Sequence, residues 1–156
     1  MNGKNGKKER KKERNDIADK KYPGIYCIAI SRSNLTGQEF SWIQQIKYVG
    51  MTNSTKGIAG RLYQFDQTIL GKNPLHGGAD RFRFKYPNYE NLTKQLFVSV
   101  CSFKCDVKSK LPADLKIMGE VAKFEYDCFA KYVEEFGNLP KFNDIKNSPK
   151  YSLTHR

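Results

Sequence analysis

Two tyrosines in glycine-flanked triplets are the residues of this chain best placed for chemistry. Gly24-Ile25-Tyr26 opens one apolar run, Tyr48-Val49-Gly50 closes a second, and Arg61 follows at the start of an expected helix. Glycine lets strands approach closely and turn, so two tyrosine-bearing strand ends followed by an arginine indicate a built site. The plainer alternatives remain open at this point, because a strand tyrosine often belongs to the core and a helix arginine often lies on the surface.

A carboxylate lies within the apolar face of the longest expected helix. At helical spacing this face consists of Met118, Val121, Phe129 and Tyr132. Glu125 falls inside that face, where a carboxylate is unfavourable unless it is paired or bound to a metal. Glu120 lies at the edge of the face, where it could be a plain surface residue or the alternative to Glu125 as a metal ligand. A carboxylate oxygen is the type of ligand that Mg²⁺ or Mn²⁺ prefers.

The elements that must position these side chains follow from the apolar patterns. Three strands are expected, over residues 25–30, 42–49 and 96–101. Three helices are expected, over residues 59–70, 79–86 and 113–136. The first two strands should pair antiparallel across a long turn. The pattern predicts an α+β domain with a small antiparallel or mixed sheet of three or slightly more strands, flanked by helices.

The charge of the chain favours a polyanionic partner. The 156 residues carry 28 Lys and Arg against 16 Asp and Glu, a formal net charge of +12, which suits nucleic acid or an acidic membrane surface. Residues 1–21 read as a basic, flexible arm that either contacts a nucleic-acid backbone or is simply solvated. Residues 22–156 form the domain and its C-terminal tail. No apolar run approaches the roughly 18 residues of a membrane span, so a cytoplasmic protein is expected. A membrane surface is the less favoured partner, because no strongly amphipathic basic helix carries large apolar anchors.

Taken in order, these residues resemble the GIY-YIG nuclease family, and the resemblance covers about residues 22–143. It implies that Tyr26 takes a proton from the attacking water and that Tyr48 lines the same cleft. It also implies that Arg61 holds phosphate oxygens and that Glu125 binds the metal, which leaves Glu120 as the alternative ligand.

The resemblance brings two further residues into the expected site. His76, in Leu75-His76-Gly77-Gly78, is similar to a family histidine that could move a proton or bind phosphate, although an ordinary loop histidine is equally compatible. Asn143, in Pro140-Lys141-Phe142-Asn143, matches a family asparagine that would hold a phosphate or backbone near the site, although it could also be a turn residue.

The resemblance therefore implies a divalent-metal-dependent endonuclease that hydrolyses phosphodiesters in double-stranded DNA with Mg²⁺ or Mn²⁺. The style is that of the small type II restriction endonucleases of the family, which would act as a homodimer to cut both strands. A phage or repair nickase, or a non-catalytic nucleic-acid-binding module, are the alternatives. Basic residues expected to contact DNA are Lys47, Lys56, Arg81 and Arg83.

Overall fold

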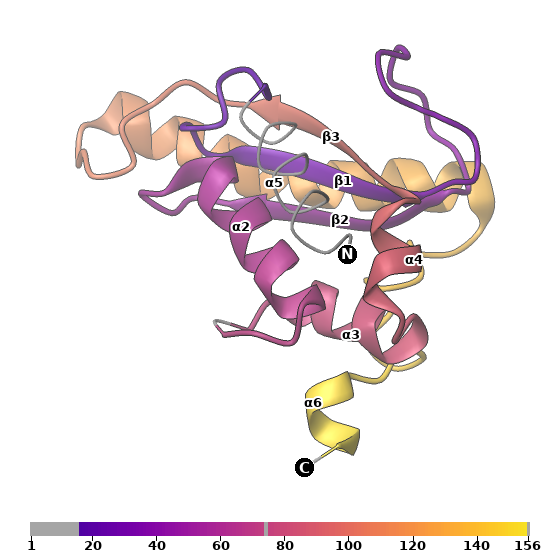
Figure 1. The fold of residues 1–156 in the computed structure, drawn as a ribbon. Coiled ribbons are helices and arrows are strands. Elements are labelled where there is room, and N and C mark those ends of the chain that lie inside the picture. The colour runs from indigo at the N-terminus through magenta and orange to yellow at the C-terminus, as the bar shows by residue number, and fades with distance from the viewer. Residues whose placement is uncertain (1–15, 74, 156) are drawn as a thin grey trace.

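The computed structural model describes residues 16–73 and 75–155, which build a sheet with helices on both faces (Figure 1). The sheet has three antiparallel strands, β1 (Gly24–Ile30), β2 (Ile46–Thr52) and β3 (Leu96–Ser102), in the order β2-β1-β3. The α+β class and the antiparallel sheet are thereby confirmed. The predicted basic arm falls mainly on residues 1–15, which lie outside the described residues.

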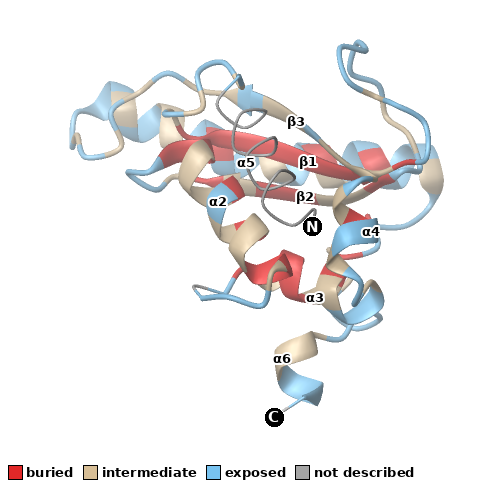
Figure 2. Ribbon diagram, in the orientation of Figure 1, coloured by how far each residue is buried: buried red, intermediate tan, exposed pale blue. Residues whose placement is uncertain are grey.

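Strand β1 is central and divides its side chains between two cores. Tyr26 and Ile28 face one core, whereas Ile25, Cys27 and Ala29 face the other, as the alternation of a strand requires. Figure 2 shows β1 buried along most of its length, while the edge strand β3 is only partly covered. The Tyr26 side of the sheet is therefore the side on which the candidate chemistry lies.

Helices cover both faces of the sheet. On the Tyr26 face lie α2 (Gly57–Ile69) and α3 (Gly77–Lys85), which contribute Leu62, Phe65 and Phe82 to the core. On the opposite face lies α5 (Pro112–Phe136), which packs Val121, Cys128 and Tyr132 against the sheet (Figure 1). Proline begins α5, and Gly137 ends it with a φ of 79° in the left-handed region, as the sequence predicts.

The second strand differs from its expected position. It was expected over residues 42–49, but it begins at Ile46 and continues to Thr52. Trp42 and Ile43 lie before the strand and pack against the core on the α5 side of the sheet. The Trp42 and Tyr132 ring centroids lie 6.3 Å apart there. The Ile46 N–H donates to the Ile43 carbonyl in a turn that precedes the strand. Pairing with β1, not the apolar pattern, decides where β2 begins.

Two short helices were not expected from the sequence, α4 (Tyr89–Thr93) and α6 (Tyr151–Thr154). The helix expected over residues 59–70 starts two residues earlier, at Gly57, because the carbonyls of Tyr22 and Lys20 accept the Ile58 and Ala59 N–H groups at 3.0 and 2.8 Å. No helix in the described part of the chain is long and apolar enough to cross a membrane.

Candidate active site

The two motif tyrosines meet on one face of the sheet. Tyr26 in β1 pairs with Gly50 in β2, and Tyr48 lies two residues before Gly50 on the same strand. Tyr48 therefore points to the same face as Tyr26. The two ring centroids lie 6.1 Å apart. Tyr26 is fully buried, whereas Tyr48 is half-buried, so Tyr48 is the more accessible of the two phenols.

Two glycines give the tyrosine rings their space. A Cβ atom on Gly50 would lie 2.5 Å from the Tyr26 hydroxyl oxygen and 2.8 Å from a Tyr48 ring carbon. A Cβ atom on Gly78, at the start of α3, would lie 2.6 Å from the same Tyr48 ring on its other edge. Real Cβ atoms do not approach so closely, so any side chain at either position would displace a phenol. The glycine of the second motif thus has a direct steric role.

His76 lies against the first tyrosine and caps α3. Its Nε2 atom is 2.7 Å from the Tyr26 hydroxyl, and its Nδ1 atom accepts the Ala79 N–H at 3.2 Å. The Thr68 hydroxyl accepts the His76 backbone N–H at 2.7 Å and so ties α2 to this position. Burial, followed by the charge of Arg61, lowers the pKa of His76 to about 3. His76 is therefore a buried, neutral helix cap and not a surface loop residue.

Arg61 supplies the positive charge that the other candidates share. It lies at the start of the second turn of α2, not in the first turn as expected, because the helix begins at Gly57. Its guanidinium donates to the Gln64 side chain at 2.9 Å. Its charge acts on Tyr26, Tyr48 and His76, and also on Glu125. One cation thus faces both phenols and the candidate metal ligand.

Glu125 reaches the site from the opposite face of the sheet. It lies on α5 and is half-buried, whereas Glu120 on the same helix is exposed. Burial raises the pKa of Glu125, and a hydrogen bond from the Met51 backbone and the charge of Arg61 partly offset that rise. A side chain of α5 can face Tyr48 only because β2 is an edge strand, so Glu125 passes around that edge.

Asn143 makes both of its side-chain hydrogen bonds to the same edge. Its Oδ1 accepts the Val49 N–H at 2.8 Å, and its Nδ2 donates to the Val49 carbonyl at 2.7 Å. The neighbouring Phe142 N–H donates to the Lys47 carbonyl at 2.8 Å. The outer edge of β2 is therefore hydrogen-bonded at every second residue. Phe142 bonds residue 47, Asn143 bonds residue 49 and Glu125 bonds residue 51. Asn143 holds the strand that carries Tyr48, whereas the resemblance implies that it holds a phosphate or backbone near the site.

The four basic residues expected to contact DNA occupy different surroundings. Lys56 is exposed at the start of α2, and half-buried Arg81 donates to the Ser148 carbonyl while its charge reaches Tyr48. The Arg83 guanidinium stacks over the Tyr151 ring, 3.8 Å from its centroid. Lys47 donates to the Gln44 carbonyl at 2.5 Å, and it lies at the register shift between β1 and β2, where it has no partner on β1. The cation whose charge acts on Tyr26 is Arg61.

The surroundings of the phenols decide what they can do. Burial raises the pKa of Tyr26 well above its ordinary value, and burial likewise raises the pKa of Tyr48. A protonated, buried phenol is a weak base at neutral pH, so proton transfer needs added positive charge. Arg61 already lowers the pKa of both phenols in part. A divalent cation beside Glu125 would add to that effect.

The carboxylate near the phenols suits a metal ion that the protein and a substrate phosphate would bind together. Among residues 16–73 and 75–155, no group of three or more His, Cys, Asp or Glu side chains forms a cage for a metal ion. Mg²⁺ is commonly held by one or two carboxylates together with substrate phosphates and water. Glu125 is a half-buried carboxylate, and burial raises its pKa by more than the Met51 backbone and Arg61 lower it, so a bound cation would supply favourable charge there.

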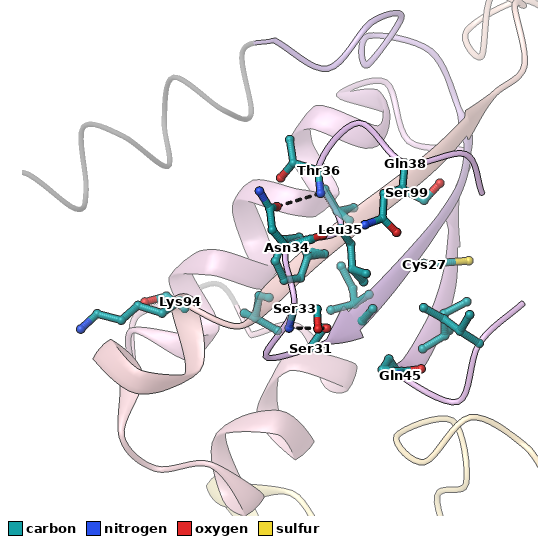
Figure 3. A pocket seen from close by; sticks show the side chains of 18 of the residues that line it. Cys27, Ser31, Ser33, Asn34, Leu35, Thr36, Gln38, Gln45, Lys94 and Ser99 are labelled. Atoms are coloured by element: carbon teal, nitrogen blue, oxygen red, sulfur yellow. Dashed lines mark hydrogen bonds between the residues drawn. The ribbon is translucent and has the colours of Figure 1, made fainter. Parts of the chain in front are cut away.

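A separate hollow lies beside the loop that joins β1 to β2. Its lining includes Ser31, Asn34 and Gln38 of this loop and Lys94, which follows α4 (Figure 3). Its described lining residues include neither Tyr26 nor Tyr48. The polar loop thus has its own surface, distinct from the phenol cluster.

Comparison of the chain with protein-family models, with curated proteins and with solved structures finds no match. Sequence reasoning found the residues of the phenol cluster but missed Gly78 and Thr68. A Gly-Gly pair after His76 was the available signal for Gly78, whereas nothing in the sequence marked Thr68.

Proposed function

We propose that this chain is a divalent-metal-dependent endonuclease that hydrolyses phosphodiester bonds in DNA. One observation carries the proposal: four different elements bring Tyr26, Tyr48, Arg61 and Glu125 together. The two phenol rings lie 6.1 Å apart, and the charge of Arg61 acts on both phenols and on Glu125. A fold does not need two phenols, a guanidinium and a desolvated carboxylate at one place for its stability. The resemblance to the GIY-YIG family gives this grouping a chemical meaning.

Each residue has a role that its surroundings permit. The phenol pair of Tyr26 and Tyr48 would accept a proton from the attacking water, with Tyr26 as the base and Tyr48 orienting the water. Arg61 would hold the phosphate oxygens as negative charge builds on them. Glu125 would hold Mg²⁺ or Mn²⁺, which when bound neutralises charge on the phosphate and the leaving oxygen. Asn143 would keep the Tyr48 strand in place.

The finer proposal is site-specific cleavage of double-stranded DNA, as in a small type II restriction endonuclease. The net charge of +12 supports binding to a polyanion. The loop between β1 and β2 and the hollow beside it offer polar side chains for contacts with base edges. Cutting both strands would require two copies of the chain. A nickase of the same family would use the same residues as a monomer.

A plasmid assay with two matched variants tests the proposal. Glu125→Gln should reduce cleavage at least about a thousandfold, because the metal contributes several kcal/mol to the transition state, yet leave DNA binding intact. Glu120→Gln makes the same change at an exposed position of α5 and should cut like the wild type. Loss of cleavage in Glu120→Gln alone would move the ligand to Glu120. A wild type that cuts no DNA with either metal would leave only a nucleic-acid-binding module.

The products distinguish the two nuclease alternatives. Discrete linear fragments from supercoiled plasmid support a restriction-type enzyme, whereas open circles as the sole product support a nickase. A gel-filtration measurement with cognate DNA should show two copies of the chain in the first case.

A further inference from the structure

The imidazole ring of His76 has a hydrogen-bonding partner at each nitrogen. Nδ1 accepts the Ala79 backbone N–H at 3.2 Å, and Nε2 lies 2.7 Å from the Tyr26 hydroxyl oxygen. A backbone N–H can only donate, so Nδ1 carries no proton. A neutral imidazole has one proton, and that proton must be on Nε2. The helix cap thus fixes the tautomer of the ring.

We propose that His76 is a positioning residue that donates its Nε2–H to the Tyr26 oxygen and thereby turns the Tyr26 hydroxyl proton toward Tyr48. The inference rests on the proposed function for its catalytic meaning, since it concerns the same phenol pair. It goes beyond that function because it states which group donates and which accepts in the hydrogen bond between His76 and Tyr26. Nε2 already bears a proton, so His76 cannot accept the proton of Tyr26.

The surroundings of the ring agree with a neutral donor. His76 is fully buried, and the rings of Tyr48 and Phe65 lie beside it, with centroids 5.7 and 5.3 Å away. The charged group whose field reaches the ring is Arg61, which opposes a second positive charge. Hydrogen bonding between Tyr26 and Tyr48 affects the pKa of each phenol. Tyr48 is the more exposed of the two phenols, which fits its role of orienting the water beside Tyr26.

Nitrogen NMR tests this direction without any need for catalysis. The chain has two histidines, so the signals of ¹⁵N-labelled His76 can be assigned against exposed His155. The expected spectrum shows a protonated Nε2 and an unprotonated Nδ1, unchanged from about pH 8 to about pH 5. A protonated Nδ1, or a ring that gains its second proton in this range, would overturn the inference.

A variant that keeps the cap but not the donor tests the consequence. In His76→Asn the shorter side chain can still accept the Ala79 N–H, because asparagine is a preferred N-cap, but it cannot reach Tyr26. The fold should persist, while kcat for cleavage falls about tenfold or more and KM stays nearly unchanged, as expected for the loss of one hydrogen bond to a developing charge. Wild-type kcat in this variant would overturn the inference. If the wild type does not cut DNA, the proposed function fails, and the NMR spectrum still decides the tautomer.

Discussion

Replacing Gly50 with alanine should disturb the phenol pair more than the fold. The new Cβ would lie 2.5 Å from the Tyr26 hydroxyl oxygen, whereas ordinary contacts begin at 3.4 Å. The oxygen must therefore move by about 0.9 Å, and misplacement of a catalytic group by about 1 Å commonly costs about a hundredfold in rate. Both neighbouring rings are held in the core and cannot swing away easily. Overpacking of this kind typically lowers the free energy of unfolding by about 1–3 kcal/mol.

The measurement pairs single-turnover DNA cleavage with urea unfolding. Gly50→Ala should remain folded at 25 °C and bind DNA, but cleave it about a hundredfold more slowly than the wild type. Gly119→Ala is the control, because a Cβ at this position on α5 meets no atom within 4 Å. That control should cut normally and gain up to about 1 kcal/mol of stability from better helix propensity.

A wild-type cleavage rate in Gly50→Ala would contradict this reasoning. If Gly50→Ala cleaves DNA at the wild-type rate while it remains folded, the Tyr26 oxygen does not need its present position. Gly50 would then serve only the packing of the sheet, and the Tyr26 oxygen would have no part in the reaction.

Two further predictions concern stability. Asn143→Ala should lower the free energy of unfolding by about 1–3 kcal/mol, since two hydrogen bonds to Val49 are lost; a change below about 0.5 kcal/mol in urea unfolding would contradict this role. Folding lowers the pKa of His76 from 6.5 to about 3, so the unfolded chain takes up the proton first as the pH falls. The free energy of unfolding should therefore decrease below about pH 6.5, by at most about 1.4 kcal/mol per pH unit. Urea unfolding at several pH values should show this slope in the wild type and a smaller one in His76→Asn, and equal slopes would refute the assignment.

Local pattern was sufficient for much of the architecture. The spacing of apolar residues placed β1, β3 and α5 within one residue or so at each end, and it placed Glu125 on the inner side of its helix. These features depend on strand alternation and helical periodicity, which neighbouring residues encode. The shift of β2 depends on which residues pair with β1, and a single strand does not encode its partner.

The finer structure of the site was not accessible from the sequence. The two hydrogen bonds of Asn143 join residues 94 positions apart, and the contact of His76 with Tyr26 spans 50 positions. No local pattern reports such contacts. The resemblance named both residues, but only the folded chain shows that one caps a helix and the other pairs with the edge of a strand.

The pairing of the β2 edge has a consequence for synthesis on the ribosome. Both tyrosines and Arg61 leave the exit tunnel early, and all three strands have been translated by Ser102. The groups that pair with the edge, on Glu125 and Asn143, follow much later. A nascent chain can thus form most of its sheet before Glu125 and Asn143, which pair with the β2 edge, have been translated. Under the proposed function, Glu125 would therefore join the phenol pair only after the sheet has formed.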